Sequence, residues 1–298
     1  FHKVDEAKEF IAQTGAPIVV KADGLAAGKG VVVAMTIEEA NAAVEDMLSG
    51  NRFGDAGSTV VIEEFMEGEE ASLLAFVDGK TVVPMIASQD HKRIFDGDKG
   101  PNTGGMGTYA PAPVLTNALR DEAMKTILEP MVAAMEKEGM PYVGCLYAGL
   151  MITPQGPKVV EFNARFGDPE TQVVLPLLDS DLGQIMMACA TGTLTADMVK
   201  WKDSSAACVI LASKGYPETS SKGDVIHGDI KQHDTTIVFH SGTKLVGDEY
   251  VTNGGRVLGV VGLGKDLRTA LDRAYGRIEH IDFEGMQYRT DIGAKAFK

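Results

Sequence analysis

One stretch narrows the fold and the chemistry of this chain more than any other: Val159-Val160-Glu161-Phe162-Asn163-Ala164-Arg165-Phe166-Gly167-Asp168-Pro169-Glu170-Thr171-Gln172. Side chains alternate between the two faces of a β-strand. We therefore expect Glu161, Asn163 and Arg165 to share one face of a strand. The opposite face, apolar enough to be buried, would hold Val160, Phe162 and Ala164. Pro169 is expected to end the strand, because proline cannot donate a hydrogen bond to a neighbouring strand.

The polar face of this expected strand carries the side chains of a metal and anion site. Glu161 and Asn163 supply hard oxygen ligands of the kind that Mg²⁺ prefers. The guanidinium of Arg165 suits a phosphoryl or carboxylate oxygen. The alternative is a half-exposed edge strand with solvated charges, because a short Glu-x-Asn pattern recurs by chance. The arginine in register and the Gly-Asp-Pro-Glu turn that follows favour the metal site, and with it phosphoryl chemistry.

The composition limits the class of protein. A chain of 298 residues with 44% hydrophobic residues is long enough for two domains with buried cores. Its net charge of −14 argues against binding of nucleic acid or of an anionic membrane, but not against small anionic ligands, which local groups can hold. The cysteines Cys145, Cys189 and Cys208 are far apart and lack metal-ligand spacing, which indicates a reducing compartment, the cytoplasm.

The sequence contains no recognisable membrane-spanning or signal segment. No apolar run reaches the length of a membrane span, and no signal peptide is visible. The chain begins Phe1-His2-Lys3, without methionine, so we expect a further N-terminal portion in the full protein.

Hydrophobic periodicity and turn residues predict an α+β chain. Helices are expected at residues 4–15, 36–48, 117–138, 183–191 and 266–281, the second of them opened by a capping box of Thr36 and Glu39. Strands are expected at residues 16–21, 31–34, 59–64, 206–213, 236–240 and 256–262. Hairpins are expected at residues 71–86 and 145–163. Residues 88–113 are expected to form a long polar loop, and loops of that length are usually functional.

A glycine-rich segment follows the first strand: Lys21-Ala22-Asp23-Gly24-Leu25-Ala26-Ala27-Gly28-Lys29-Gly30. Closely spaced glycines let backbone N–H groups approach phosphate oxygens, and lysine adds positive charge. The segment is not a Walker motif, because only four residues separate Gly24 from Lys29 and a strand rather than a helix follows. A hairpin turn with a solvated lysine is the alternative for Lys29 alone. A lysine on each side of the loop favours nucleotide phosphates.

A third segment suits the same ligand. Val60-Val61-Ile62-Glu63-Glu64-Phe65-Met66 is a buried strand that runs into acidic residues, and Glu70 follows shortly after. Backbone groups just beyond a buried strand can bind the edge of adenine, and a carboxylate can bind ribose hydroxyls. Taken alone, this segment would be an ordinary acidic turn.

These three segments, in this order, resemble an ATP-grasp domain. The resemblance is more specific at residues 165–172, Arg-Phe-Gly-Asp-Pro-Glu-Thr-Gln, which is similar to the signature of the glycinamide ribonucleotide synthetase family. Three further segments are similarly typical of that family: residues 21–30, Gln89-Asp90-His91-Lys92-Arg93, and Gly100-Pro101-Asn102-Thr103-Gly104-Gly105-Met106-Gly107. The resemblance covers essentially the whole chain.

The resemblance implies an α+β ATP-grasp fold, in which two α+β lobes clasp ATP, followed by a small C-terminal α+β module. The ATP-grasp domain would span residues 1–193, with a small lobe at about 1–66 and a larger lobe at about 67–193. The C-terminal module would span residues 194–298. In the full protein an N-terminal domain that helps to bind phosphoribosylamine would lie upstream.

The family reaction joins glycine to 5-phosphoribosylamine at the expense of ATP, in purine biosynthesis. The glycine carboxylate would attack the γ-phosphate to give glycyl phosphate, and the amine would then displace phosphate. Such an enzyme works by positioning its substrates and by stabilising the charge on the transferred phosphoryl group, with Mg²⁺ or Mn²⁺ bound. Residues 22–30 would close over the acyl phosphate as a lid.

The resemblance also implies roles for individual residues. Glu161 and Asn163 would bind the metal, and Lys21 and Arg165 would be catalytic. The residues expected to contact ATP are Lys21, Gly24, Gly28, Lys29, Gly30, Glu63, Glu64, Phe65, Met66 and Glu70. The residues expected to contact the ribose-phosphate substrate are Asp90, His91, Lys92, Arg165, Asp168 and Glu170. For His91 an alternative is equally open, namely a histidine that orders its own loop.

The chain departs from the ATP-grasp pattern at one point. Many ATP-grasp enzymes carry a further carboxylate metal ligand on the strand before Glu-x-Asn, but residues 145–152 contain none.

Two other functions stay open from the sequence. A different ATP-grasp ligase, such as a relative of the purine-pathway carboxylases, is one alternative; Arg-Phe-Gly-Asp-Pro-Glu argues against it. The other is a nucleotide-binding module without turnover, which would bind ATP but release no phosphate in response to glycine.

Overall fold

The computed structural model describes residues 1–24, 30–49 and 57–297. The chain divides into two compact units, Phe1–Glu67 and Gly68–Lys298. Each unit combines helices with antiparallel sheets, so the predicted α+β class is confirmed. None of the described helices is both long and apolar enough to span a membrane.

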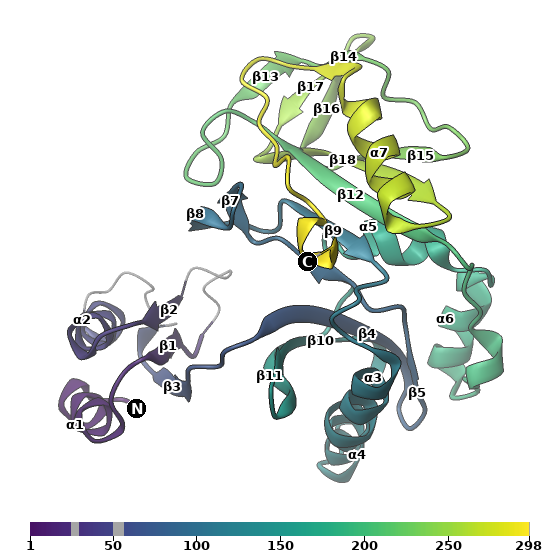
Figure 1. Cartoon of the computed structure of the whole chain (residues 1–298). Coiled ribbons are helices and arrows are strands. Elements are labelled where there is room, and N and C mark those ends of the chain that lie inside the picture. The colour runs from purple at the N-terminus through teal and green to yellow at the C-terminus, as the bar shows by residue number, and fades with distance from the viewer. Residues whose placement is uncertain (25–29, 50–56, 298) are drawn as a thin grey trace. The chain divides into compact units, whose positions relative to one another are not determined.

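The first unit is a three-stranded sheet with two helices on one face (Figure 1). Its strands lie in the order β2-β1-β3 and are all antiparallel: β1 Ile18–Ala22, β2 Val31–Ala34 and β3 Val60–Glu64. The helices are α1 Val4–Thr14 and α2 Ile37–Leu48. Thr36 caps α2 as expected, because its hydroxyl accepts a hydrogen bond from the Glu39 N–H. The Glu39 carboxylate accepts a hydrogen bond from the Met35 N–H at 2.8 Å, and so satisfies another N–H just before the helix.

The second unit contains a four-stranded antiparallel sheet in the order β11-β10-β4-β5. Its strands are β4 Glu69–Asp78, β5 Val82–Pro84, β10 Val143–Thr153 and β11 Gly156–Asn163. One face packs against α3 Asn117–Ala123 and α4 Glu129–Lys137, which are joined by a π-helical turn, Met124–Leu128. The opposite face packs against α6 Leu182–Thr191 through Leu74, Phe76 and Cys145.

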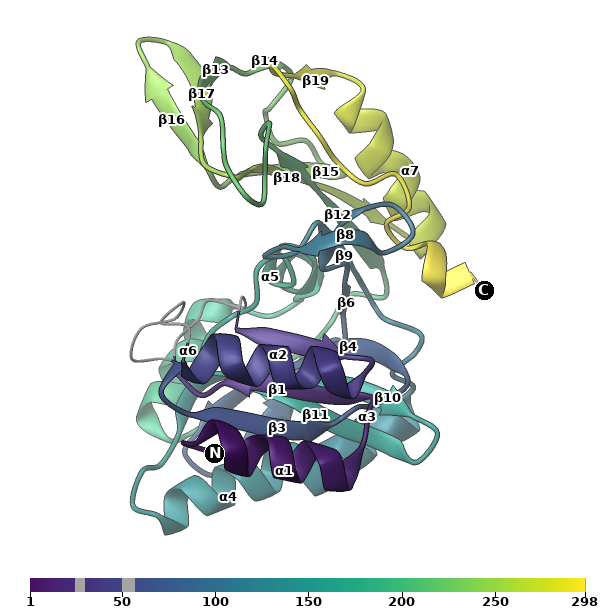
Figure 2. The ribbon, with the colours of Figure 1, turned by 90° about the vertical axis from the view of Figure 1, so that its left-hand side faces the viewer.

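A five-stranded antiparallel sheet in the order β15-β18-β12-β9-β6 forms the rest of the core of this unit. Its strands are β6 Gln89–Asp90, β9 Gly107–Ala110, β12 Ser205–Ala212, β15 Thr236–His240 and β18 Arg256–Gly264. Helix α7 Leu267–Ile278 runs along one face of this sheet (Figure 2). The other face packs against α5 Thr171–Val174 and the 3₁₀ turn Leu175–Leu177.

The remaining elements are short. A three-stranded sheet has the order β13-β17-β16, with β13 Lys222–Val225, β16 Thr243–Val246 and β17 Glu249–Asn253. Two-stranded pairs are formed by β14 His227–Gly228 with β19 Ile281–Asp282, and by β7 Arg93–Phe95 with β8 Lys99–Asn102. Ala196–Met198 and Ala294–Phe297 are 3₁₀ turns.

The expectation of one long polar loop at residues 88–113 was wrong. The segment contains β6, β7, β8 and β9. These strands have only two to four residues each, and β8 contains glycine and proline, so they are too short for an alternating pattern to be visible. Because β9 pairs with β12, one sheet contains strands from both sides of residue 194. The boundary drawn there from the sequence stays a prediction.

The residues after β19, 283–297, are called the C-terminal segment. They hold the β7–β8 hairpin in place through a buried arginine, Arg289. The Arg289 side chain is 1% exposed and forms ion pairs with Asp98 at 2.9 Å and Asp291 at 2.7 Å. It also donates a hydrogen bond to the Arg93 carbonyl at 3.1 Å. Burial alone would raise the pKa of Asp98 and Asp291, but their hydrogen bonds, those from Arg289 included, outweigh it and hold both pKa values below their usual range.

Candidate active site

The four-stranded sheet has polar side chains on the face opposite α3 and α4, where β11, β10 and β4 lie side by side. Residues directly opposite one another on antiparallel strands point to the same side. On the central strand β10, Gly149 lies opposite both Glu161 and Ser72, and Tyr147 lies opposite Asn163. Ser72, Tyr147, Glu161 and Asn163 therefore share the face that points away from α3 and α4.

A β-bulge in β11 produces this arrangement. Gly149 pairs with Glu161 but the next residue, Leu150, pairs with Val159, so Val160 is the extra residue. Val159 and Phe162 consequently pack against the same core, although they are an odd number of residues apart. The strand ends at Asn163, so Arg165 lies beyond it and Ala164 is exposed. The expectations that Ala164 would be buried and that Pro169 would end the strand were wrong.

Glu161 and Asn163 could hold a metal ion. The Asn163 amide donates a hydrogen bond to Oε1 of Glu161 at 3.1 Å, so the two side chains lie together at the exposed strand end. In the described parts of the chain no group of three or more His, Cys, Asp or Glu side chains could bind a metal. A site of two oxygen ligands suits Mg²⁺, which usually keeps water and substrate phosphates in its other positions.

Glu170 reaches the same face from the turn that follows β11. It is 3% exposed, and its Oε1 accepts hydrogen bonds from the Tyr147 hydroxyl at 2.8 Å and the Ser72 hydroxyl at 3.1 Å. A side chain at Gly167 would meet Oε2 of Glu170 at 2.4 Å. Glycine at position 167 therefore leaves room for this carboxylate, which two hydroxyl groups hold in one position.

Asp90 and Lys92 come to this face from β6 and the residues after it. Lys92 forms an ion pair with Glu70 at 2.8 Å. Removal of water and then the charge of Glu170 raise the pKa of Asp90 well above its usual range. Burial opposes the charge on Lys92, but Glu70, followed by Asp90 and Glu161, outweighs it and raises the pKa of Lys92. The structure thus brings together Glu70, Asp90, Lys92, Glu161 and Glu170, and the ligand contacts expected of them stay predictions.

Asp168 has a partner that the sequence did not reveal. Arg256, the first residue of β18, forms an ion pair with Oδ2 of Asp168 at 3.1 Å. It also donates hydrogen bonds to the carbonyls of Asp168 at 3.0 Å and Gly104 at 2.9 Å. Arg256 is 88 residues from Asp168 and belongs to no recognisable motif, so no local pattern could have identified it.

His91 is buried and bonded to the backbone, which favours the alternative that the sequence left open. It is 1% exposed, its Nδ1 lies 3.1 Å from the Gly107 carbonyl, and its Nε2 accepts a hydrogen bond from the Gly293 N–H at 3.4 Å. Burial and then the charge of Arg289 lower its pKa to about 4. A neutral His91 with its proton on Nδ1 satisfies both contacts, so the geometry supports a role in ordering its own segment.

Of the predicted ATP residues of the first unit, those that the structure describes lie on and beside the sheet face opposite α1 and α2. Lys21 lies opposite Val31 on one side and Val61 on the other, and its amine forms an ion pair with Glu63 at 2.6 Å. The large hydrophobic side chains exposed on this face are Val31, Val33 and Val61. Of the other predicted contacts, Gly24 and Glu64 are exposed, Phe65 and Met66 are half-buried, and Gly30 is buried. Gly28 and Lys29 lie outside the described residues. In the second unit Arg165 is exposed and donates a hydrogen bond to the Phe166 carbonyl at 2.8 Å.

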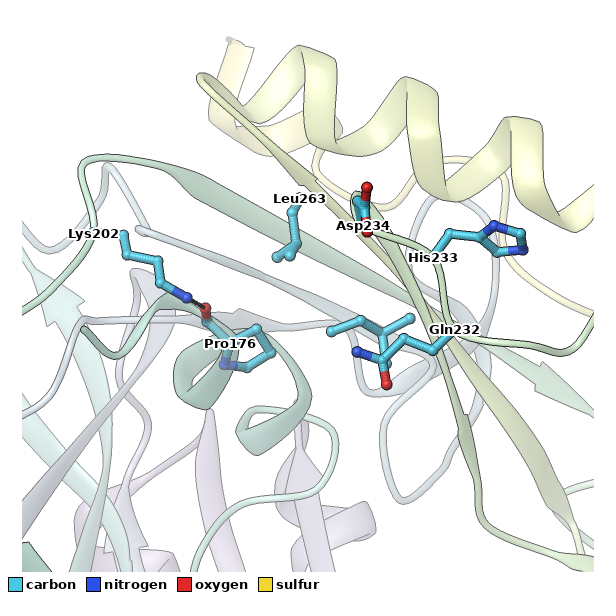
Figure 3. Close-up of a pocket in the computed structure, with 7 residues that line it drawn as sticks. Pro176, Lys202, Gln232, His233, Asp234 and Leu263 are labelled. Atoms are coloured by element: carbon cyan, nitrogen blue, oxygen red, sulfur yellow. Dashed lines mark hydrogen bonds between the residues drawn. The ribbon is translucent and has the colours of Figure 1, made fainter. Parts of the chain in front are cut away.

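A depression of about 510 Å³ in the second unit does not involve any of these residues (Figure 3). Lys202, on its wall, donates a hydrogen bond to the Pro176 carbonyl at 2.9 Å. The His233 side chain points away from it and contacts Asp229 at 3.0 Å. Because these polar groups are already bonded within the protein, the depression is a weaker candidate than the polar face.

Comparison with known proteins matches two family domains to this chain and identifies its fold. A family described as "Phosphoribosylglycinamide synthetase, ATP-grasp (A) domain" matches residues 1–171, and its "C domain" matches residues 206–295. Phosphoribosylamine–glycine ligase of Neisseria meningitidis is 54% identical over 99% of this chain and 70% of that protein. The crystal structure of the ligase of that name from Thermotoga maritima is 35% identical with a TM-score of 0.88, over 98% of this chain and 73% of that one. A biotin carboxylase of Campylobacter jejuni, at 14% identity, covers 96% of this chain and 62% of that one; its TM-score of 0.74 indicates a shared fold alone. The predicted ATP-grasp fold is confirmed.

The lowered pKa of His91 gives a testable pH dependence of stability. Since the folded pKa lies near 4 and that of the unfolded chain near 6.5, the unfolded state binds the proton more readily. The contribution is fully present above about pH 6.5 and is lost as the pH falls toward 4. Urea unfolding, followed by the fluorescence of Trp201, should show a smaller loss of stability between pH 7 and pH 4.5 in His91→Gln than in the unaltered chain. His227→Gln, at an exposed position, is the control and should keep the original pH dependence; equal slopes in all three proteins would contradict the assignment.

Proposed function

The chain belongs to the phosphoribosylglycinamide synthetase family, and from that premise we propose that it ligates glycine to 5-phosphoribosylamine. The reaction would consume ATP, pass through glycyl phosphate, and give glycinamide ribonucleotide, ADP and phosphate in purine biosynthesis. The observation that carries the proposal is the polar sheet face, where Glu161 and Asn163 lie on the same surface as the fixed carboxylate of Glu170. A ligase of this type needs a place for phosphates and metal next to a place for an amine.

We propose that the sheet face of the first unit opposite α1 and α2 binds ATP. Val31, Val33 and Val61 form an apolar surface against which a purine ring can lie, and the Lys21 amine among them can bind a phosphate. Backbone groups at Glu64, the last residue of β3, and at Phe65 and Met66, directly after it, can hydrogen-bond to the edge of the base. The predicted ribose contact, Glu70, is part of this proposal. So are Gly24, Gly28, Lys29 and Gly30 as phosphate contacts.

Mg²⁺ or Mn²⁺ is the metal that the residues fit best. Glu161 and Asn163 would hold it, and when bound it would neutralise charge on the phosphates. Arg165, just beyond these residues, would stabilise the transferring phosphoryl group or the glycine carboxylate. The protein's own contribution is to hold these groups in place before the reaction begins.

The carboxylates Asp90 and Glu170 suit the amine substrate. An amine that attacks an acyl group loses a proton as the C–N bond forms, and a nearby carboxylate can accept it. A raised pKa makes Asp90 a better proton acceptor than an ordinary aspartate. Lys92, paired with Glu70, adds positive charge for the phosphate of the ribose substrate. Asp168 is proposed to bind the same substrate, and His91 is proposed to support it by ordering the segment after β6.

The cellular setting of this proposal is the cytoplasm, with small molecules as partners. Cys145, Cys189 and Cys208 are all free and buried, as expected in a reducing compartment. We propose ATP, glycine and 5-phosphoribosylamine as the substrates, and neither nucleic acid nor a membrane as a partner.

The reaction itself gives the first test. With Mg·ATP, this chain should release ADP and phosphate only when glycine and phosphoribosylamine are both present. A coupled assay of ADP, run with each substrate omitted in turn, measures this. ATP binding without release would favour a nucleotide-binding module, and release that depends on bicarbonate instead of glycine would favour a carboxylase relative.

Replacement of Glu161 tests the metal site. Because Glu161 is exposed, Glu161→Ala should leave the melting temperature within a few degrees of the original. Turnover should fall by at least about 100-fold if the side chain contributes to charge stabilisation in the transition state. Binding of Mn²⁺, followed by electron paramagnetic resonance in the presence of ATP, should weaken in parallel. Glu129→Ala, exposed on α4, is the control; a collapsed melting transition for Glu161→Ala would instead make Glu161 structural.

A charge on the apolar face tests the ATP site. Val33 is 49% exposed, so Val33→Glu should fold normally but weaken ATP binding by at least about tenfold, because the carboxylate would meet the base or the phosphates. Calorimetric titration with ATP measures the affinity. Phe10→Glu is the matched control, at a 38% exposed position on α1. Unchanged affinity in Val33→Glu would remove this face from the ATP site.

A further inference from the structure

Arg256 joins two segments that carry the carboxylates of the amine site. Its guanidinium contacts the Gly104–Gly105 turn through two carbonyls, at 2.9 Å to Gly104 and 3.5 Å to Gly105. The same group contacts Asp168 through both its carbonyl and its side chain. A planar guanidinium can hold several acceptors in fixed directions, which a lysine cannot.

Each of the two segments positions one carboxylate. Gly105 has φ +114°, and a side chain there would meet Oδ1 of Asp90 at 2.8 Å and Pro169 at 2.5 Å. The Gly104–Gly105 turn is thus packed directly against Asp90 and against the residue that precedes Glu170. A shift of the turn would displace Asp90, and a shift of Asp168 would displace Glu170.

Arg256 also counters the repulsion between these carboxylates. The charge of Glu170 acts to raise the pKa of Asp90, and the charge of Arg256 acts to lower it. Two carboxylates that share a small site repel one another unless a cation lies close by. The Arg256 side chain is only 20% exposed, so its charge is less screened by solvent than that of a surface arginine.

A second residue, Tyr216, contacts the same turn. The Tyr216 hydroxyl accepts a hydrogen bond from the Gly104 N–H at 2.9 Å. A side chain at Gly255, next to Arg256, would meet the Tyr216 ring at 2.2 Å, so the ring and this part of the backbone are in close contact. Tyr216 and Arg256 therefore hold both the N–H and the carbonyl of Gly104.

We propose that Arg256 is a positioning residue for the ligase reaction, which holds the Gly104–Gly105 turn against Asp168 and thereby sets Asp90 and Glu170 side by side for the amine substrate. This role rests on the proposed function. It predicts a defect in the use of the amine and not in the binding of ATP, because none of these contacts involves a residue assigned to ATP.

The test compares Arg256→Gln, Arg256→Lys and the control Arg277→Gln. Arg277, on α7, is also a poorly exposed arginine, and it contacts Asp229 and the Lys231 carbonyl instead. In Arg256→Gln, kcat/KM for phosphoribosylamine should fall by about 100-fold, as expected for a small misplacement of reacting groups. The dissociation constant for ATP should stay within about twofold. Arg256→Lys, which restores the charge but not the fork of donors, should recover part of the loss, and Arg277→Gln should be unaffected.

Hydrogen exchange provides a second readout that does not depend on turnover. Backbone amides of residues 103–107 and 167–172 should exchange faster in Arg256→Gln than in the unaltered chain, and those of α7 should not. Unchanged kinetics and unchanged exchange in Arg256→Gln, with an active unaltered chain, would overturn the role of Arg256 and leave the proposed function standing. An equal loss of ATP affinity and amine use would also overturn it, because it would indicate general destabilisation. Absence of ADP release from the unaltered chain would instead count against the proposed function, and with it the role of Arg256.

Discussion

The β-bulge at Val160 is the constraint on which the candidate active site depends. Strict alternation along β11 would put Val159 and Glu161 on the same face, so one of them would be badly placed. The extra residue lets Val159 pack into the core under α3 and α4 and still turns Glu161 toward the open face. Because β10 lies between β11 and β4, the same register places Glu161 level with Ser72. Ser72 in turn holds Glu170, so a single local irregularity sets the distance between the metal ligands and the carboxylate site.

The site gathers negative charge in a chain that is already acidic. A net charge of −14 would repel ATP and a ribose phosphate at long range, but salt screens that field beyond about 8–10 Å. At short range individual cations matter, and three of them form ion pairs within their own unit: Lys92 with Glu70 and Arg256 with Asp168 in the second unit, and Lys21 with Glu63 in the first. The pairs keep these cations in position, and an anionic ligand can compete for each of them because their partner carboxylates are half-exposed.

Sequence patterns were informative where the determining contacts are local. The hairpin of β10 and β11, the cap at Thr36 and the helix α7 depend on periodicity and on turn or capping residues within a few positions, and all three formed as expected. The prediction for residues 88–113 failed because strands there pair with strands distant in the sequence, as β9 pairs with β12. Residues 165–172 singled out Glu170 as an expected substrate contact, which stays a prediction. Arg256 was not identified, since its contacts with Asp168 span 88 residues and include a backbone carbonyl, which every residue type possesses.

The same long-range contacts explain why the residues after 194 matter for a site built mostly from earlier ones. The strand β12 completes the sheet on which β9 and β6 depend, and β6 carries Asp90. The Gly293 N–H fixes the ring of His91, and Arg289 holds the hairpin that begins two residues later. Asp90 and Lys92 flank His91, so their backbone is held on one side by β9 and on the other by the C-terminal segment. Residues 88–113 have only short strands and many glycines, so they have few contacts of their own to fix the position of Asp90. The C-terminal residues supply the rigidity that the local sequence lacks, and this is why loss of a single contact such as that of Arg256 is expected to act on the amine site.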